Sequence, residues 1–562
     1  MAEVMANATL LERTAKTRGL VSAAATKGTV FLCGVVLLGI LIHFLCHPLL
    51  IPAEAALNIE YGKLILAGKS PYLDFYDYTS PFAMYMAVLP CYISSHLPIH
   101  PILAANLCIW FALVLSTSLS SLVLMRTPSR ENSLAPFLLI GFVLFNFLIR
   151  DYFGETQQLL FTFTTPYIFS RIYSSTKHDV DLRILGFCGA FAAFGFLLDP
   201  LYLLLLILFE AFICLEKGTF KSLSSADFTS CFSVLVIAGI LLIVCAEPVG
   251  MSYSGFGYFM MMIDYYNWDN QLVYLGMTPD RRDLIYFSFI AVALGLSFSR
   301  RSRMISPMVA ISVLGFGLYV LQGKMFTHQA IPMLFGAFMC LSLVAGVLFS
   351  WSVSRLSLKE KARNTGFIAV LVLAVLGLTV YGYLEYSDLK RADSYSLAEQ
   401  GYVGASSRED LSIFADYLLK ETSPGDSVLF INDQARPAYP LLLQIGRNPG
   451  SGFLSTRLLK IAHRLRFSQP VKVWQNYVVK ENDLYERLKE DIRSKKPRLI
   501  IVNQDSMGPA LEEKLVSKEI LDSYEPKGFL DWNEDKDSHP PFEYTGYRTA
   551  FHVFKLKEAD SK

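Results

Sequence analysis

The feature that most constrains this chain is a series of long apolar runs that recur before residue 387. Most of them are about 17 to 25 residues long, which is the length an α-helix needs to cross the hydrocarbon core of a bilayer. Hydrophobic residues make up 53% of the 562 residues, while charged residues make up only 18%. The sequence therefore predicts an integral membrane protein built as a bundle of transmembrane α-helices.

About eleven runs are predicted to span the bilayer. They lie at residues 30–50, 101–125, 134–149, 157–173, 184–198, 200–216, 229–246, 284–299, 304–322, 329–352 and 366–386. A further apolar segment, Pro81 to Leu97, contains Pro90 and is followed by Pro98. We predict that this segment is an interfacial or re-entrant helix, because counting it as a span would place the basic loops outside the cell.

The charges of the connecting loops predict the orientation, since cytosolic loops carry an excess of Lys and Arg. With Pro81 to Leu97 left out of the spans, the basic residues all fall on the cytosolic side together with the N-terminus. These residues are Arg126, Arg130, Lys177, Arg183, Lys217, Lys221, Arg300, Arg301, Arg303, Arg355, Lys359, Lys361 and Arg363. Segments predicted to be external are 51–100, 150–156, 247–283, 323–328 and everything after about residue 387.

Composition divides the chain into a polar cytosolic tail at 1–28, a transmembrane domain at 29–386 and a soluble domain at 387–562. In the soluble part, an amphipathic helix at Ser407–Glu421 precedes a buried strand at Asp426–Ile431. A second helix and strand follow at Asp483–Arg493 and Arg498–Val502. This alternation predicts a small extracytoplasmic α/β domain behind the helical bundle.

Cysteine and charge usage exclude several functions. No cysteine follows Cys340, so neither disulfides nor a cysteine zinc site stabilises the C-terminal domain. The net charge of +1 and the lack of a basic stripe argue against nucleic-acid binding. Two Asp-x-Asp matches, at Asp179 and Asp535, are attributed to chance, and the sequence contains no Gly-rich phosphate loop. We expect no metal and no cofactor, and a location in the plasma membrane or bacterial inner membrane.

The first external loop, 51–100, has an unusual density of acids, aromatics and turn residues close behind the first span. Its acids are Glu54, Glu60, Asp74 and Asp77. An acid-bearing helix ends at Gly68, and Pro71-Tyr72-Leu73-Asp74-Phe75, Asp77 and Pro81 follow. A loop of this composition indicates a reaction site at the membrane surface.

That pattern resembles the first external loop of polytopic glycosyltransferases of the GT-C class, which use polyprenyl-phosphate sugars. The class includes protein mannosyltransferases and the aminoarabinose transferase of lipid A, and the resemblance covers residues 30–350 in order. It implies a GT-C-like bundle that transfers a sugar at the external face, with an external domain that helps acceptor recognition. The expected partners are a polyprenyl-phosphate-linked sugar donor, a glycan, lipid or protein acceptor, and the lipid bilayer.

The resemblance also implies roles for the loop acids. In the resembling enzymes an acid, often in an Asp-Glu pair, opens this loop and acts as the general base. The matching place here reads Pro52-Ala53-Glu54-Ala55, with a single Glu. Glu54 is therefore the expected base, because displacement at an anomeric carbon needs a carboxylate within hydrogen-bond reach of the attacking hydroxyl. Asp74 or Asp77 could act instead, or these acids could be structural, and Glu60 is an expected substrate-binding residue.

A second group of candidates follows the third predicted span. Asp151 and Glu155 lie at 150–156, where the resembling enzymes place another functional acid, and would bind donor or acceptor hydroxyls. The alternative is an ordinary polar cap between two helices.

Fixed positive charge is needed where a phosphate leaves. Lys324 and His328, before a late helix, are the first candidates, as the resemblance implies. Arg281 and Arg282 are the second, because they lie outside against the charge rule. Interfacial anchoring is the alternative for these arginines.

Together these features predict a membrane glycosyltransferase, inverting by expectation, that moves a sugar from a polyprenyl-phosphate donor to an acceptor hydroxyl. A transporter or flippase of lipid-linked sugars is the alternative from another class, since it could use the same basic and aromatic surface. A non-catalytic scaffold would leave the dense first loop without an explanation.

Overall fold

The computed structural model describes residues 28–77, 79–125, 134–173, 181–244, 279–322, 327–355, 411–468, 471–503, 522–533 and 548–557. The predicted span at 366–386, residues 247–278 of the predicted external loop at 247–283, and the candidate Lys324 lie outside them.

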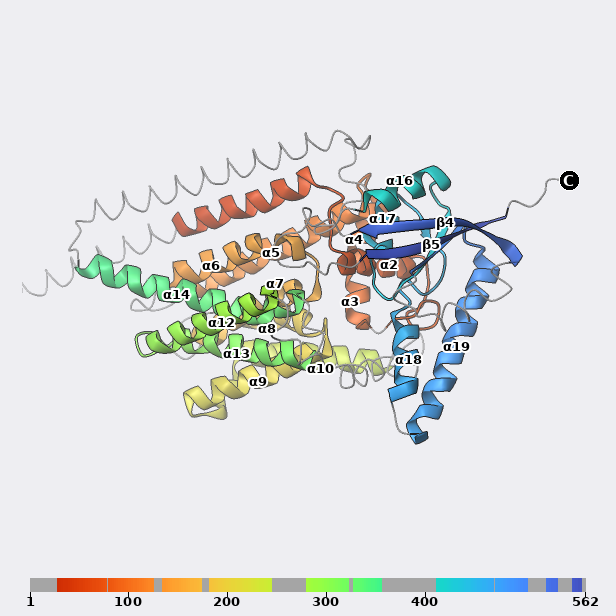
Figure 1. The fold of residues 1–562 in the computed structure, drawn as a ribbon. Coiled ribbons are helices and arrows are strands. Elements are labelled where there is room, and N and C mark those ends of the chain that lie inside the picture. Colours follow the sequence, from red (N-terminus) through yellow and green to blue (C-terminus); the bar gives the residue numbers. More distant parts are fainter. Residues whose placement is uncertain are drawn as a thin grey trace, which may run out of the picture.

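A bundle of helices forms the first part of the molecule, and its helices run alongside one another (Figure 1). Each predicted span before residue 353 coincides with one helix. The helices are Gly28–Cys46, α5 (Pro101–Met125), α6 (Ala135–Leu148), α7 (Thr156–Tyr173), α8 (Leu182–Phe196), α9 (Pro200–Lys217), α10 (Ala226–Val244), α12 (Pro279–Phe298), α13 (Ile305–Leu321) and α14 (Ile331–Arg355).

Three helices in the described part are long and apolar enough to cross a membrane: Gly28–Cys46, Pro101–Leu124 and Thr327–Phe349. Shorter apolar helices are Ala135–Leu148, Leu182–Phe196, Ala226–Leu241 and Ile305–Leu321. A helix needs about 20 apolar residues to span, and several of these helices are shorter or carry charged side chains. The structure thus supports a helical membrane bundle, while the predicted number of eleven spans is not confirmed.

The doubtful segment after the first loop is divided into two short helices, α3 (Pro81–Met86) and α4 (Val88–His96). At 1.5 Å per residue they are about 9 and 14 Å long, well below the thickness of about 30 Å that a span must cross. This agrees with the prediction of a non-spanning helix. Helix α2 (Ala53–Leu66) packs on the break, where a Cβ on Gly62 would lie 2.4 Å from the Ala87 carbonyl oxygen.

The C-terminal part is an α/β domain, as predicted. Its five-stranded sheet has the order β2-β1-β3-β5-β4, with β1 parallel to β2 and β3, and β5 antiparallel to β3 and β4. The strands are β1 (Ser427–Ile431), β2 (Asn448–Pro449), β3 (Leu499–Asn503), β4 (Tyr524–Asn533) and β5 (Arg548–Leu556). The helices are α16 (Ser412–Glu421), α17 (Ala438–Gln444), α18 (Arg457–Ser468) and α19 (Val471–Lys495).

The first loop and the C-terminal domain share one hydrophobic core, which lies at one end of the bundle (Figure 1). Gln444 Nε2 donates a hydrogen bond of 2.9 Å to the Leu49 carbonyl, and Tyr76 N donates one of 3.0 Å to the Gly452 carbonyl. A Cβ on Gly452 would lie only 2.5 Å from the Asp74 carbonyl oxygen. The domain is therefore packed closely on the loop that carries the candidate acids, and holds it in place.

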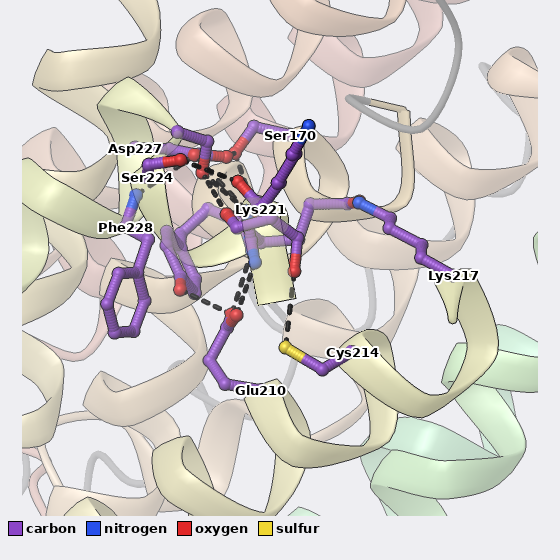
Figure 2. Close-up of polar contacts among 12 residues, drawn as sticks. Ser170, Glu210, Cys214, Lys217, Lys221, Ser224, Asp227 and Phe228 are labelled. Carbon is purple, nitrogen blue, oxygen red and sulfur yellow. Dashed lines mark hydrogen bonds and ion pairs between the residues drawn. The ribbon is translucent and has the colours of Figure 1, made fainter. Parts of the chain in front are cut away.

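A buried ion-pair cluster lies near the C-terminal end of α7 (Figure 2). Arg171 is fully buried, its Nε donates to Glu210 Oε1 at 2.8 Å, and its Nη1 lies 3.4 Å from Asp227 Oδ1. Nη1 also donates to Ser225 Oγ at 2.6 Å, and the Tyr167 hydroxyl donates to Glu210. These bonds tie α7, α9 and the start of α10 together, and they satisfy charges that would otherwise be strongly unfavourable in the bundle.

Candidate active site

Glu54 lies in the first turn of α2, directly after Pro52 and Ala53. Its Oε1 accepts a hydrogen bond of 2.9 Å from Nη2 of Arg457, the first residue of α18. The Arg457 Nε donates to the Asp433 carbonyl oxygen at 3.0 Å. Although this carboxylate has a partner, 40% of the Glu54 side chain stays exposed, so a substrate hydroxyl can reach it.

The charges around Glu54 keep it ionised. Partial burial among protein atoms raises the pKa of the carboxyl group. The positive charge and hydrogen bond of Arg457, the charge of a protonated His328 and the charge of Arg436 together lower this pKa by a larger amount. The net pKa of Glu54 lies below its ordinary value. The group is consequently a carboxylate at neutral pH, which is the form a general base needs.

Glu155 and His328 come near the start of α2, because Gly154 approaches Ala55 and a charge on His328 acts on the Glu54 carboxyl group. Glu155 is buried, and its Oε2 makes no hydrogen bond to any described residue. His328 lies in η4 (Thr327–Ala330), and its Nδ1 is 3.6 Å from Glu155 Oε2. The preceding Gly154 has φ +88°, and a Cβ there would lie 2.9 Å from Ala55 Cβ. Glycine thus lets the turn before α7 approach α2, and three distant segments bring two acids and a histidine together.

The other loop acids are held by local hydrogen bonds. Asp77 is buried, and its Oδ2 accepts from the Tyr61 hydroxyl and, at 3.0 Å, from Thr79 Oγ1. Asp74 Oδ2 accepts from the Ser70 backbone N at 2.7 Å and closes a turn. Both arrangements explain why the loop has its shape, and a catalytic role for either acid stays a prediction.

The remaining candidates lie elsewhere. Glu60 is buried and pairs with Lys63 Nζ at 2.9 Å. Asp151 is half-buried in η1 (Arg150–Tyr152). Arg282 is exposed in the first turn of α12, and the Arg281 side chain is not among the side chains that the structure describes. Within the described residues, no hydrogen bond or ion pair links Glu60, Asp151 or Arg282 to Glu54.

The C-terminal domain contributes residues that the sequence did not predict. Arg457 contacts Glu54 directly, the charge of Arg436 acts on it, and Lys460 Nζ pairs with Asp433 beside them. A signal for part of this set was present, because polar residues directly follow the predicted buried strand that ends at Ile431. Ligands in α/β sheets bind outside the carboxyl ends of parallel strands.

The described residues hold no group of three or more His, Cys, Asp or Glu side chains that could bind a metal ion. The arrangement has the parts of a group-transfer site: an accessible carboxylate, a buried second acid, and cations that could offset a leaving anion.

Comparison with solved structures found ArnT from Cupriavidus metallidurans bound to undecaprenyl phosphate, with 10% identity and a TM-score of 0.47 over 93% of this chain and 98% of that chain. The apo state of ArnT matches with 12% identity and a TM-score of 0.48, covering 94% and 98%. An oligosaccharyltransferase of Archaeoglobus fulgidus, in complex with Zn and sulfate, matches with 10% identity and a TM-score of 0.39, covering 92% and 72%.

No protein-family model and no curated protein matches the chain. At such identities and TM-scores the similarity concerns the overall course of the chain, and no residue takes its role from it.

Proposed function

We propose that this protein is a membrane glycosyltransferase that moves a sugar from a polyprenyl-phosphate donor to an acceptor hydroxyl. The observation that supports this most is the convergence of Glu54, Glu155 and His328, from three separate segments, at the face covered by the C-terminal domain. An accessible carboxylate beside cations suits the displacement of a phosphate by a hydroxyl.

In the proposed reaction the acceptor oxygen attacks the anomeric carbon, and Glu54 takes the hydroxyl proton. The bond between that carbon and the phosphate oxygen breaks, and the polyprenyl phosphate leaves with the electron pair. His328, with the predicted Lys324, Arg281 and Arg282, would offset the leaving charge. Glu155 would hold sugar hydroxyls, and attack opposite the leaving group would invert the anomeric carbon.

We further propose that the N-terminus is cytosolic and the C-terminal domain extracytoplasmic, in a cell inner or plasma membrane. Single-cysteine tags placed in 126–133 of the otherwise cysteine-free protein should be protected from an impermeant reagent in intact cells. Tags after residue 400 should react. The reverse pattern would contradict the orientation and the external site.

The function is tested with purified full-length protein in detergent, given a panel of polyprenyl-phosphate sugars and acceptors. We expect release of free polyprenyl phosphate, because a glycosyltransferase cleaves its donor without a membrane to transport across. A protein that releases none from the whole panel, yet moves lipid-linked sugars across vesicles, would be the alternative flippase.

A further inference from the structure

The C-terminal domain supplies two arginines to the surroundings of Glu54. Arg457 and Glu54 are 403 positions apart in the sequence, yet their side chains are in hydrogen-bond contact. Arg436 lies close enough for its charge to lower the pKa of the Glu54 carboxyl group. The exposed fractions of the Arg457 and Glu54 side chains are 28% and 40%, so an incoming molecule can reach this pair.

The arginines occupy a place in the domain that suits ligand binding. Arg436 follows β1, at the carboxyl end of two parallel strands, β1 and β3. Asn503 Nδ2 at the end of β3 donates to Asn432 Oδ1 at 2.8 Å, and Thr456 N, just before α18, donates to the Asn432 carbonyl at 2.8 Å. These bonds fix the loops that carry Arg436 and Arg457 at the edge where α/β sheets bind their ligands.

The contact with Glu54 indicates which substrate the arginines would meet. In an in-line displacement the base contacts the attacking hydroxyl, and the leaving phosphate departs from the opposite face of the anomeric carbon. A group within 2.9 Å of Glu54 is therefore on the acceptor side of the reaction. His328, by contrast, faces the buried Glu155.

We propose that Arg457, assisted by Arg436, binds a phosphate group of the acceptor, and that this anion replaces Glu54 as the partner of Arg457. The inference rests on the proposed function, because it assigns Glu54 as the base. An Arg side chain suits this task, since its planar guanidinium can donate two parallel hydrogen bonds to a phosphate. Loss of the Arg457 partner raises the pKa of Glu54, and the carboxylate becomes a better base at the moment the acceptor is in place.

The test measures equilibrium binding of two probes to the full-length protein in detergent: glycerol 1-phosphate for the acceptor side and undecaprenyl phosphate for the donor side. Arg457→Gln should weaken glycerol phosphate binding by roughly tenfold or more, because a charge-assisted hydrogen bond is lost. Arg457→Lys should have a glycerol phosphate affinity between those of the wild type and Arg457→Gln. Arg436→Gln should weaken glycerol phosphate binding less than Arg457→Gln does. Glu54→Gln should strengthen binding, since it removes the carboxylate that competes for Arg457. The control is Lys527→Gln, which removes an exposed cation paired with Glu525.

Two results would overturn the inference: unchanged glycerol phosphate affinity in both Arg457→Gln and Arg436→Gln, or a loss confined to undecaprenyl phosphate. The second result would assign the arginines to the donor. The proposed function fails separately, if the wild-type protein cleaves no donor. Arg457-dependent binding of glycerol phosphate would then still support the anion site.

Discussion

Helix α7 has a charged site at each of its two ends, and the two sites differ in how their charges are satisfied. At its C-terminal end Arg171, with no exposed surface, is bound by Glu210 and Asp227. Just before its N-terminus, Glu155 Oε2 lacks a hydrogen bond within the described part, and the Glu54 side chain on α2, the helix that Gly154 approaches, is 40% exposed. Arg171 lies sixteen positions after Glu155 in the sequence, which corresponds to about 24 Å along the helix.

The difference shows how to distinguish structural charges from reactive ones in this protein. Buried charges that are paired with one another have no hydrogen-bonding groups left for a substrate. Their role is to hold the helices in register. A carboxylate that is ionised, accessible and incompletely hydrogen-bonded can still accept a proton or a hydroxyl. The Arg171 cluster is accordingly structural, and the Glu54 site is where we expect chemistry.

The strongest way to break the comparison is Arg171→Met, which leaves the buried Glu210 and Asp227 carboxylates without the arginine that pairs with both. We expect a loss of about 3–5 kcal/mol of stability, measured as a lower thermal unfolding midpoint in detergent. The triple variant R171M/E210Q/D227N should recover part of the loss, since no uncompensated charge remains. Lys527→Met, at an exposed pair, should change stability by less than about 1 kcal/mol. An unchanged midpoint in Arg171→Met would show that the cluster does not hold the bundle.

Gly154→Ala tests whether the Glu54 site depends on the approach of α7 to α2. A Cβ at this position would lie 2.9 Å from Ala55 Cβ, on backbone with φ +88°. We expect Gly154→Ala to lower the folding stability by about 1–3 kcal/mol and to reduce the rate of sugar transfer markedly, because the turn must move away from α2.

Gly218 is the matched control, because it also has a positive φ, +62°, but a Cβ there would contact nothing within 4 Å. Gly218→Ala should lower the folding stability by only about 1 kcal/mol, which is the cost of the positive φ for alanine, and should keep the wild-type rate of sugar transfer. Equal transfer in the two variants would contradict the proposed role of the contact.

The sequence predicted the bundle helices, but only two of the five strands of the C-terminal domain, β1 and β3, and only part of the site. Apolar length located the bundle helices, and the prolines with the loop charges predicted that Pro81 to Leu97 does not span, which agrees with its division into two short helices. The Arg457–Glu54 contact could not be predicted, because it depends on how the C-terminal domain docks on the first loop. The Arg171 cluster was missed for another reason: 157–173 and 200–216 were interpreted as plain spans, although Arg171 and Glu210 interrupt their apolar runs.

The pH dependence of donor cleavage sharpens the comparison at the Glu54 site. The base must be ionised, and the neighbouring cations hold its folded-state pKa below the ordinary value of about 4.3. The decline of kcat/KM that is due to protonation of Glu54 should therefore occur only below that ordinary value. In Arg457→Gln the decline should begin at higher pH, since a positive charge is lost. If kcat/KM declines at the same low pH in the wild type and in Arg457→Gln, Glu54 is not the catalytic base.

The smallest effect is expected for Asp74→Asn. The amide oxygen can still accept the Ser70 hydrogen bond, so stability should change by less than about 1 kcal/mol. Transfer should stay within a few-fold of the wild-type rate. Loss of transfer in a folded Asp74→Asn protein would assign the base to Asp74 instead.

The most direct measurement compares Glu54→Gln with Glu210→Gln, two isosteric changes at sites near opposite ends of α7, by donor cleavage rate and by unfolding midpoint. Glu54→Gln should slow cleavage by about two to three orders of magnitude, with the midpoint nearly unchanged. Glu210→Gln should lower the midpoint, and the protein that remains folded should cleave the donor at a rate close to wild type. A Glu54→Gln protein that keeps its rate, or a Glu210→Gln protein that keeps its midpoint and loses its rate, would contradict this account.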